Sequence, residues 1–207
     1  MATAATVAGR QRSVALVALG CPKNLVDSEY ALGSFALAGY RITTDTAEAD
    51  VVVVTTCGFL EVAVRESTDT IRRILRSRKR RPGQQVVVAG CLVERLRTAP
   101  CSMPEGVDLL VGLNRMNRIP ELLHPGFRPK TGVRTAANLM RLVSTPSHYA
   151  YLKIADGCDN RCTYCLIPSI RGPRRSRPIP EIVREARSLA RLGVRELVLV
   201  GQDTSAY

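Results

Sequence analysis

Apolar and polar residues alternate along the first 123 residues in a way that predicts repeated strand–helix units. Short valine-rich runs are typical of strands that are buried on both faces of a parallel sheet. Such runs cover residues 13–19, 50–55, 85–89 and 107–111. The more polar segments between and after them predict helices over 25–38, 60–80 and 117–123. Asn24 is expected to cap the first helix and Gly39 to end it.

The order of these elements predicts an α/β fold, because alternating strands and helices build a parallel sheet with helices on its faces. Residues 124–148 are richer in Pro, Gly, Ser and Thr and are expected to form a linker. Beyond it, a strand over 149–155, a helix over 180–192 and a strand over 196–200 predict one βαβ unit. The expected organisation is a disordered segment 1–12, a first domain 13–123, the linker, and an incomplete second domain 149–207.

Composition and charge narrow the class of protein. The 207 residues are 45% hydrophobic, and no apolar run approaches the ~18 residues that a membrane span needs. The net charge is +12, and all but four of the 30 basic residues are arginine. Such a charge favours nucleic-acid partners. A GC-rich genome, whose codons favour arginine, explains it equally well. One basic group lies in 72–81, and another comprises Arg171, Arg174, Arg175 and Arg177.

The seven cysteines are the main candidates for chemistry. The chain carries no export signal, so a reducing cytoplasm is expected, where clustered thiols indicate metal binding or catalysis rather than disulfides. Cys158, Cys162 and Cys165 lie within eight residues, in a loop after a predicted strand. Three thiolates are one short of the four that close a zinc site or an ordinary iron–sulfur cluster. This spacing favours a 4Fe-4S cluster with one open iron.

Two other interpretations of that loop remain. A structural zinc site would need a fourth ligand, and both histidines, His124 and His148, lie in the expected linker. Unligated structural cysteines are the second alternative.

A second set of cysteines follows the predicted strands of the first domain. Cys21, Cys57 and Cys91 each come two residues after a strand. The carboxyl ends of parallel strands share one edge, where ligands bind, so these cysteines should converge on a second metal site. Alternatively, these three cysteines bind no metal and are small hydrophobic residues buried in the core. Cys101 does not share this position and is expected to be a bystander.

The CxxxCxxC spacing, with Tyr164 before the last cysteine, resembles the radical S-adenosylmethionine (radical SAM) superfamily. The two cysteine sets together resemble the methylthiotransferases. This resemblance implies a flavodoxin-like first domain that holds an auxiliary 4Fe-4S cluster through Cys21, Cys57 and Cys91. It also implies a partial (β/α) barrel whose first part holds the radical SAM 4Fe-4S cluster through Cys158, Cys162 and Cys165.

Within that family, short sequence motifs distinguish the branches that act on different substrates. Residues 20–29, 167–172 and 201–207 are similar to the branch that modifies an aspartate of protein S-twelve in the small ribosomal subunit. The tRNA-modifying branch more often has Cys-Gln-Met-Asn where this chain has Cys-Pro-Lys-Asn. Thr55-Thr56-Cys57 departs slightly from the expected Asn-Thr-Cys and keeps the ligand. A tRNA methylthiotransferase and a non-catalytic iron–sulfur module for electron transfer or binding are the rival functions.

The resemblance further implies the cofactors and partners. S-adenosyl-L-methionine would bind the second cluster, with Tyr164, Gln202 and Asp203 as its expected contacts. No catalytic acid–base residue is expected. A flavodoxin or ferredoxin would donate electrons, and no membrane partner is expected. Arg171, Arg174 and Arg175 would either approach ribosomal RNA or be solvated. A complete barrel of eight units has about 250 residues, so the chain is expected to be a fragment that is inactive alone.

Overall fold

A computed structural model describes residues 6–7, 10–78, 82–98, 102–125 and 141–207. Its main sheet has five parallel strands in the order β4-β3-β5-β6-β7. The strands are β3 (Ser13–Ala18), β4 (Arg41–Ile42), β5 (Val51–Thr56), β6 (Gln85–Gly90) and β7 (Leu109–Val111). In order of sequence these are strands 2-1-3-4-5, the arrangement of flavodoxin-like folds.

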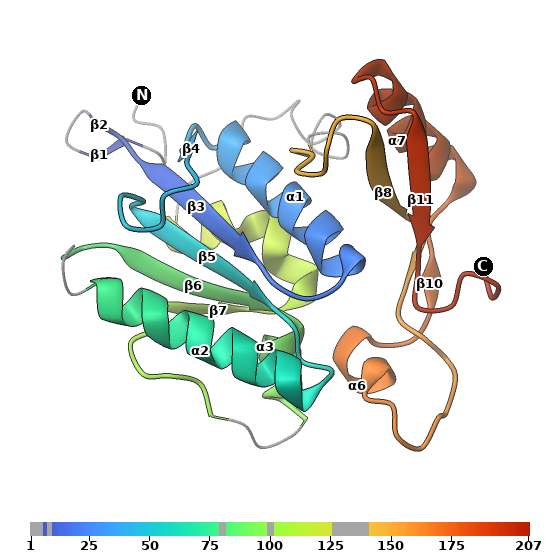
Figure 1. Cartoon of the computed structure of the whole chain (residues 1–207), viewed down its shortest axis with the longest axis horizontal. Coiled ribbons are helices and arrows are strands. Elements are labelled where there is room, and N and C mark those ends of the chain that lie inside the picture. Colours follow the sequence, from blue (N-terminus) through green and yellow to red (C-terminus); the bar gives the residue numbers. More distant parts are fainter. Residues whose placement is uncertain (1–5, 8–9, 79–81, 99–101, 126–140) are drawn as a thin grey trace.

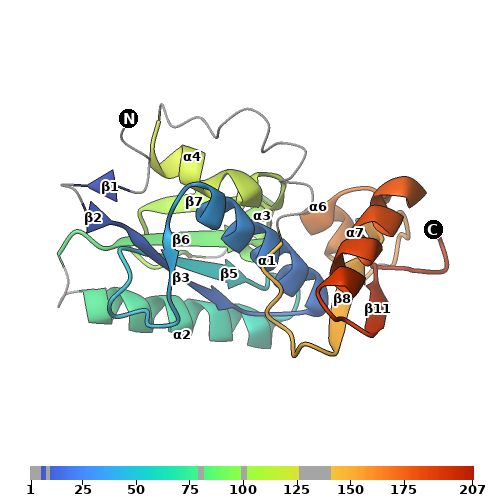
Figure 2. The ribbon, with the colours of Figure 1, turned by 90° about the horizontal axis from the view of Figure 1, so that it is seen from above.

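Helices cover both faces of this sheet (Figures 1 and 2). On one face α1 (Pro22–Leu37), the 3-10 helix η1 (Leu113–Arg118) and α4 (Ile119–Leu123) pack on alternate strand residues such as Val51 and Val53. On the other face α2 (Glu61–Arg78) and α3 (Cys91–Arg95) pack on Val52 and Val54. Successive strand residues point to opposite faces, so the continuous valine runs feed both cores.

Residues 149–207 form a second, smaller unit at one end of the sheet (Figure 1). Its strands β8 (Tyr149–Lys153) and β11 (Glu196–Val200) pair in parallel and are joined through α7 (Ile179–Arg191). Leu189 of α7 packs on Ala150 and Leu152 of β8. Between β8 and α7 lie β9 (Ala155–Asp156), α6 (Ile167–Arg171) and β10 (Arg175–Ser176), and β9 and β10 form an antiparallel pair.

The second unit lies beyond the carboxyl ends of the main sheet, toward which β3 and β5 point (Figure 1). α6 packs against α3, and β8 packs against α1. The cysteine loop of the second unit therefore lies on the same side of the molecule as the strand-end cysteines of the first.

The α/β class and the parallel sheet are confirmed. The predicted strands and helices are present, with ends that differ by a few residues. The capping role of Asn24 is wrong, because α1 begins at Pro22 with Cys21 at its N-cap position. Asn24 instead lies inside the first turn, is buried, and donates from Nδ2 to the carbonyl oxygens of Leu19 and Thr56.

Two segments that were expected to lack regular structure carry ordered contacts in their described parts. Within 1–12, β1 (Thr6–Val7) pairs with β2 (Arg10–Gln11) in a short antiparallel ladder, so the expected disorder is not found for these residues. Within the expected linker 124–148, Arg141 is buried and joins both units. Cys101 lies outside the described residues.

Candidate metal centres

The sheet register places two cysteines of the first set side by side. Thr56 of β5 is the ladder partner of Gly90 in β6, and Cys57 and Cys91 directly follow these two residues. Leu19, just after β3, donates its N–H to the Thr55 carbonyl oxygen, which brings Cys21 to the same edge. Cys21 and Cys57 thus follow the two strands between which the strand order reverses, the usual ligand site of this topology, and Cys91 follows the next strand.

Two glycines let the three cysteine loops approach one another closely. A Cβ on Gly20 would lie 3.1 Å from Cys57 Cβ, and Gly20 has a φ of +98°, which side chains rarely adopt. A Cβ on Gly58 would lie 2.5 Å from the carbonyl oxygen of Cys91. Contacts through the backbone therefore link the Cys21 loop to Cys57 and the Cys57 loop to Cys91.

Cys91 is the most enclosed of these thiols, with 6% of the residue exposed. Its Sγ donates to Asn24 Oδ1 and accepts a hydrogen bond from Arg171 Nη2, each at 3.4 Å. The pKa of the Cys91 thiol is raised to about 11, mainly by burial; the nearby Arg171 guanidinium opposes this rise, and Cys57 and Cys21 add to it. That electrostatic influence is a second sign that the three thiols face a common region.

The second set lies in the loop between β9 and α6. Cys158 donates its N–H to the Gly172 carbonyl oxygen, and Cys165 donates to that of Cys162, so local hydrogen bonds hold two of the three backbones. Cys165 Sγ accepts a bond from the Ile167 N–H at 3.5 Å. Cys162 is exposed, whereas Cys158 and Cys165 are partly buried. The set is open to incoming groups.

The six thiols are suitable ligands for iron–sulfur clusters, since all six are free and soft thiolates favour such clusters. In the described part of the chain, no three His, Cys, Asp or Glu side chains are already arranged to hold a single metal ion. A cluster differs from one ion because each cysteine binds a separate iron. The donor types and their convergence fit clusters better than a closed zinc site.

The expected S-adenosylmethionine contacts differ in their surroundings. Tyr164 has 84% of its surface exposed. Gln202 follows β11, and its Oε1 is buried without a hydrogen-bond partner. Asp203 accepts bonds from Ser205 and, at 3.4 Å, from Asn160 in the cysteine loop, and these bonds lower its pKa. The orphaned Gln202 oxygen fits a bound polar ligand, and all three roles stay predictions.

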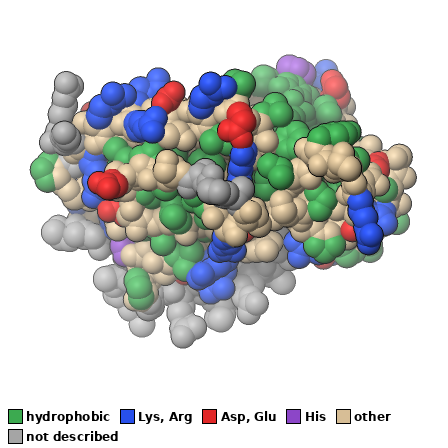
Figure 3. All heavy atoms as spheres, turned by 90° about the horizontal axis from the view of Figure 1, so that it is seen from below, with side chains coloured by type: hydrophobic (Ala, Val, Ile, Leu, Met, Phe, Trp, Pro, Cys, Tyr) green, Lys and Arg blue, Asp and Glu red, His purple; other side chains and the backbone are tan. Residues whose placement is uncertain are grey.

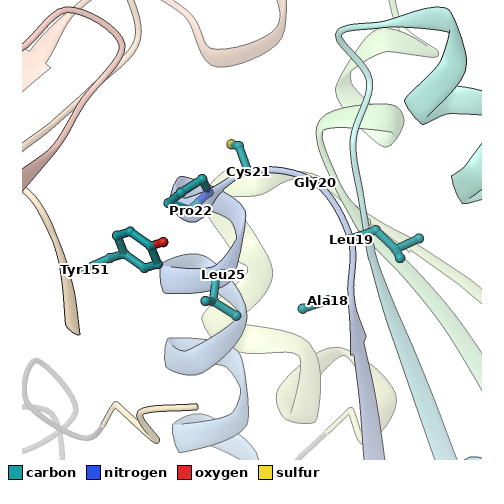
Figure 4. Close-up of a pocket in the computed structure, with 7 residues that line it drawn as sticks. All are labelled: Ala18, Leu19, Gly20, Cys21, Pro22, Leu25 and Tyr151. Atoms are coloured by element: carbon teal, nitrogen blue, oxygen red, sulfur yellow. The ribbon is translucent and has the colours of Figure 1, made fainter. Parts of the chain in front are cut away.

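A pocket of about 280 Å³ lies beside Cys21. Figure 4 shows Tyr151 reaching from β8 toward Pro22 and Leu25 on the first turn of α1. Both units therefore line this space next to the first cysteine set.

The second basic group does not act as one surface. Arg171 is buried, with 1% of its side chain exposed, so the prediction that it contacts ribosomal RNA or is solvated is wrong. Arg174 and Arg175 are exposed and remain available. On the face in Figure 3, Lys and Arg side chains are scattered among hydrophobic and neutral ones rather than forming a continuous basic patch.

Comparison with known proteins assigns both units. Residues 13–112 match the uncharacterized protein family UPF0004, and residues 152–207 match the radical SAM superfamily. The ribosomal protein uS12 methylthiotransferase RimO of Trichlorobacter lovleyi is 43% identical over 205 residues, which cover 95% of this chain and 46% of that protein. Over nearly its whole length the chain is similar to radical SAM methylthiotransferases.

Other relatives show similar agreement. RimO of Symbiobacterium thermophilum is 44% identical over 98% of this chain and 43% of its own length. RimO of Solibacter usitatus is 43% identical over 94% of this chain and 42% of its own. The chain therefore spans about half the length of the curated relatives it matches.

A solved structure agrees with the fold. The radical S-adenosylmethionine methyltransferase TsrM from Kitasatospora setae, solved with tryptophan and a SAM analogue, superposes with a TM-score of 0.55. The match covers 93% of this chain and 48% of that protein at 15% sequence identity, so it supports the fold alone.

Two residues of the site were missed from the sequence. Asn24 was interpreted as a helix cap and Arg171 as a surface cation, yet both contact Cys91. The available signal was their position: Asn24 lies three residues after Cys21, and Arg171 lies six after Cys165.

Proposed function

We propose that this chain is part of a radical SAM methylthiotransferase that modifies the β-carbon of an aspartate in ribosomal protein uS12. One observation carries the proposal: the strand-end cysteines and the CxxxCxxC loop lie on the same side of the molecule, and Arg171 and Asn24 connect them. A radical formed at one site can then meet a sulfur group held at the other. The three relatives compared above are named as uS12 methylthiotransferases, which supports the choice of substrate.

In this proposal Cys21, Cys57 and Cys91 hold the auxiliary 4Fe-4S cluster, and Cys158, Cys162 and Cys165 hold the radical SAM cluster. When bound, S-adenosyl-L-methionine supplies the adenosyl radical that abstracts hydrogen and, from a second molecule, the methyl group.

The chain's own residues then bind and enclose the reactants. The side-chain amide oxygen of Gln202, which has no hydrogen-bond partner among the described residues, can accept a hydrogen bond from the cofactor. Asp203 lies beside the cysteine loop, and the hydrogen bonds that it accepts lower its pKa and favour its ionised form. The burial of Cys91 keeps water from the inner side of the first site.

The remaining partners follow from the chemistry. A flavodoxin or ferredoxin in the cytoplasm would supply electrons, and Arg174 and Arg175 are the exposed cations of the second basic group that could approach ribosomal RNA. Among the described residues, no helix is both long and apolar enough to span a membrane.

Anaerobic reconstitution of this chain tests the two-cluster assignment. We expect about eight irons and eight sulfides per chain, four for each set. Cys57→Ala and Cys162→Ala should each lower the count to about four. Added S-adenosylmethionine should change the electron paramagnetic resonance spectrum in the Cys57→Ala variant and leave it unchanged in the Cys162→Ala variant. Loss of both signals in either variant would contradict two independent sites.

The substrate is tested in the cells that make the protein. Introducing Cys57→Ala or Cys162→Ala into the gene should remove the methylthio group from uS12, as measured by the mass of the purified ribosomal protein. The methylthio-adenosine content of tRNA should stay unchanged. Loss of methylthio groups from tRNA, with uS12 unaltered, would identify the tRNA-modifying alternative.

A further inference from the structure

Arg171 lies where the two units meet. It ends α6, the short helix that follows the second cysteine set, and it reaches across to the first set. Only 1% of its side chain is exposed. A buried guanidinium is costly unless charged or polar partners surround it, so its contacts define what it does.

Its contacts come from both cysteine loops. Nη2 donates to Asn24 Oδ1 at 2.7 Å and to Cys91 Sγ at 3.4 Å, both in the first domain. Nη1 donates to Asp156 at 2.9 Å, just before the second set. Asp27 on α1 lies 3.4 Å away. One rigid fork therefore ties the α1 turn that follows Cys21 to the loop that carries Cys158.

The charges around this fork are balanced. Arg171 and Lys153 face Asp27 and Asp156, two cations against two anions. Because these charges balance, the ion pairs with Asp27 and Asp156 hold the Arg171 guanidinium in place without a contribution from Cys91. A bound metal adds a thiolate at Cys91, and the existing N–H···S contact then becomes charge-assisted.

We propose that Arg171 is the positioning residue that locks the two cysteine sets together and donates a hydrogen bond to the Cys91 ligand of the auxiliary site. This inference rests on the proposed function for the identity of that site. Arg171 acts through Cys91 and the two loops and does not touch a substrate.

Arg141 provides the matched comparison. It is also buried and also bridges α1 to the second unit, through Glu29 at 2.5 Å and Glu185 at 2.9 Å. Within the described part of the chain, Arg141 donates hydrogen bonds to Glu29, Tyr151 and Glu185, and none of these is a cysteine or lies on α6. Replacing Arg141 therefore loosens the contact between the units but leaves the hydrogen-bond donor to Cys91 in place. Replacing Arg171 loosens that contact and also removes the donor.

Amide hydrogen exchange of the metal-free chain tests the locking role. Arg171→Met should speed exchange in residues 22–28 and in 158–172 together, by about tenfold or more, because a buried charged partner is lost. Arg171→Lys keeps the charge and should give a smaller effect, since an ammonium cannot bond in the fixed fork of a guanidinium. Arg141→Met should speed exchange near 29–37 and 141–153 only. Acceleration in just one cysteine loop of the Arg171 variants would overturn the locking role.

The reduction potential of the reconstituted first site tests the hydrogen bond. With Cys162→Ala as background, so that only the auxiliary site holds a cluster, Arg171→Lys and Arg171→Met should shift its potential to more negative values. Arg141→Met should leave it unchanged. Equal shifts in the Arg171 and Arg141 variants would overturn the proposal. If the background protein binds no iron at Cys21, Cys57 and Cys91, the proposed function fails, and the exchange data still decide the role of Arg171.

Discussion

At the scale of single residues, Gly58 is the position where the first metal site has the least space. A Cβ there would lie 2.5 Å from the Cys91 carbonyl oxygen and 2.7 Å from its carbonyl carbon, and neither backbone atom can rotate away. We expect Gly58→Ala to lower the free energy of unfolding by about 1–3 kcal/mol, typical of overpacking. It should also lower iron bound by the first set, because Cys91 must move. Urea unfolding and iron counting measure the two effects.

Gly201→Ala is the control for that substitution. Its added Cβ would lie 3.4 Å from Thr204 Cγ2, an ordinary contact with a side chain, and Gly201 has no positive φ. We expect little change in stability. An equal loss in both variants would show that the Gly58 contact is not the cause.

Residue identity predicted part of the site. Both cysteine sets could be placed beyond strand ends, because an apolar run that predicts a strand precedes each of Cys21, Cys57, Cys91 and Cys158; the sequence did not show that Cys91 begins α3. Arg171 could not be placed, because the sequence Arg-Gly-Pro-Arg-Arg looks the same whether its first arginine is buried or solvated. Only the docking of α6 on α3 decides between these states.

At the scale of elements, α1 is anchored by a charge that it buries. Glu29 is 0% exposed and accepts bonds from Arg141 and from the N–H and hydroxyl of Ser144. We expect Glu29→Gln to destabilise the fold by about 3–5 kcal/mol, because it leaves the buried Arg141 charge with one fewer partner. Chemical denaturation measures this loss.

Asp69→Asn is the matched surface control. Asp69 and Arg72 form a pair on α2 with 72% and 56% of their side chains exposed. Such a pair contributes within ~1 kcal/mol. A loss at Glu29 no larger than that at Asp69 would contradict the anchoring role.

The sequence predicted the elements themselves well, because long valine runs and the glycine after α1 have few alternative structures. It missed the short elements α3, α6, β4, β9 and β10. Their formation depends on tertiary contacts rather than on local pattern; β9 and β10, for example, are two residues each and pair only with one another. Of these elements, α3 begins at Cys91 and packs against α6, which follows the second cysteine set.

At the scale of the whole molecule, stability should depend on pH through His124. Its Nε2 lies 2.6 Å from both Arg12 Nη1 and the Tyr40 hydroxyl, joining the end of α4 to the sheet. Burial, and then the Arg12 charge, lower the pKa of His124 below its ordinary 6.5. The unfolded chain therefore binds a proton more readily. Stability should be full above pH ~6.5 and should fall as the pH drops through that value.

Unfolding free energies measured between pH ~7.5 and ~5.5 test this dependence. His124→Gln should flatten the curve in that window. Arg12→Gln should reduce the slope without removing it, because burial remains the larger cause. An unchanged slope in His124→Gln would assign the pH dependence to other groups.

The relation between the two units is the part of the molecule that the sequence left open. The predicted linker suggested two domains that are joined by the linker alone. In the structure, Arg141 and Ser144 in the described part of this segment bond to Glu29 of the first domain. Docking of this kind depends on complementary buried charges from segments more than a hundred residues apart, which no local pattern records.

The enclosure of Cys91 has a consequence for the order in which the protein matures. Residues 21–91 leave the ribosome before Arg171, since synthesis runs from the N-terminus. During that interval Arg171 and α6 do not yet cover Cys91, so iron and sulfide can reach it without any separation of the units. Once α6 docks and Arg171 covers Cys91, insertion requires the units to part. Cluster assembly at the first site is therefore favoured during synthesis, and a finished chain that has folded empty should load it slowly.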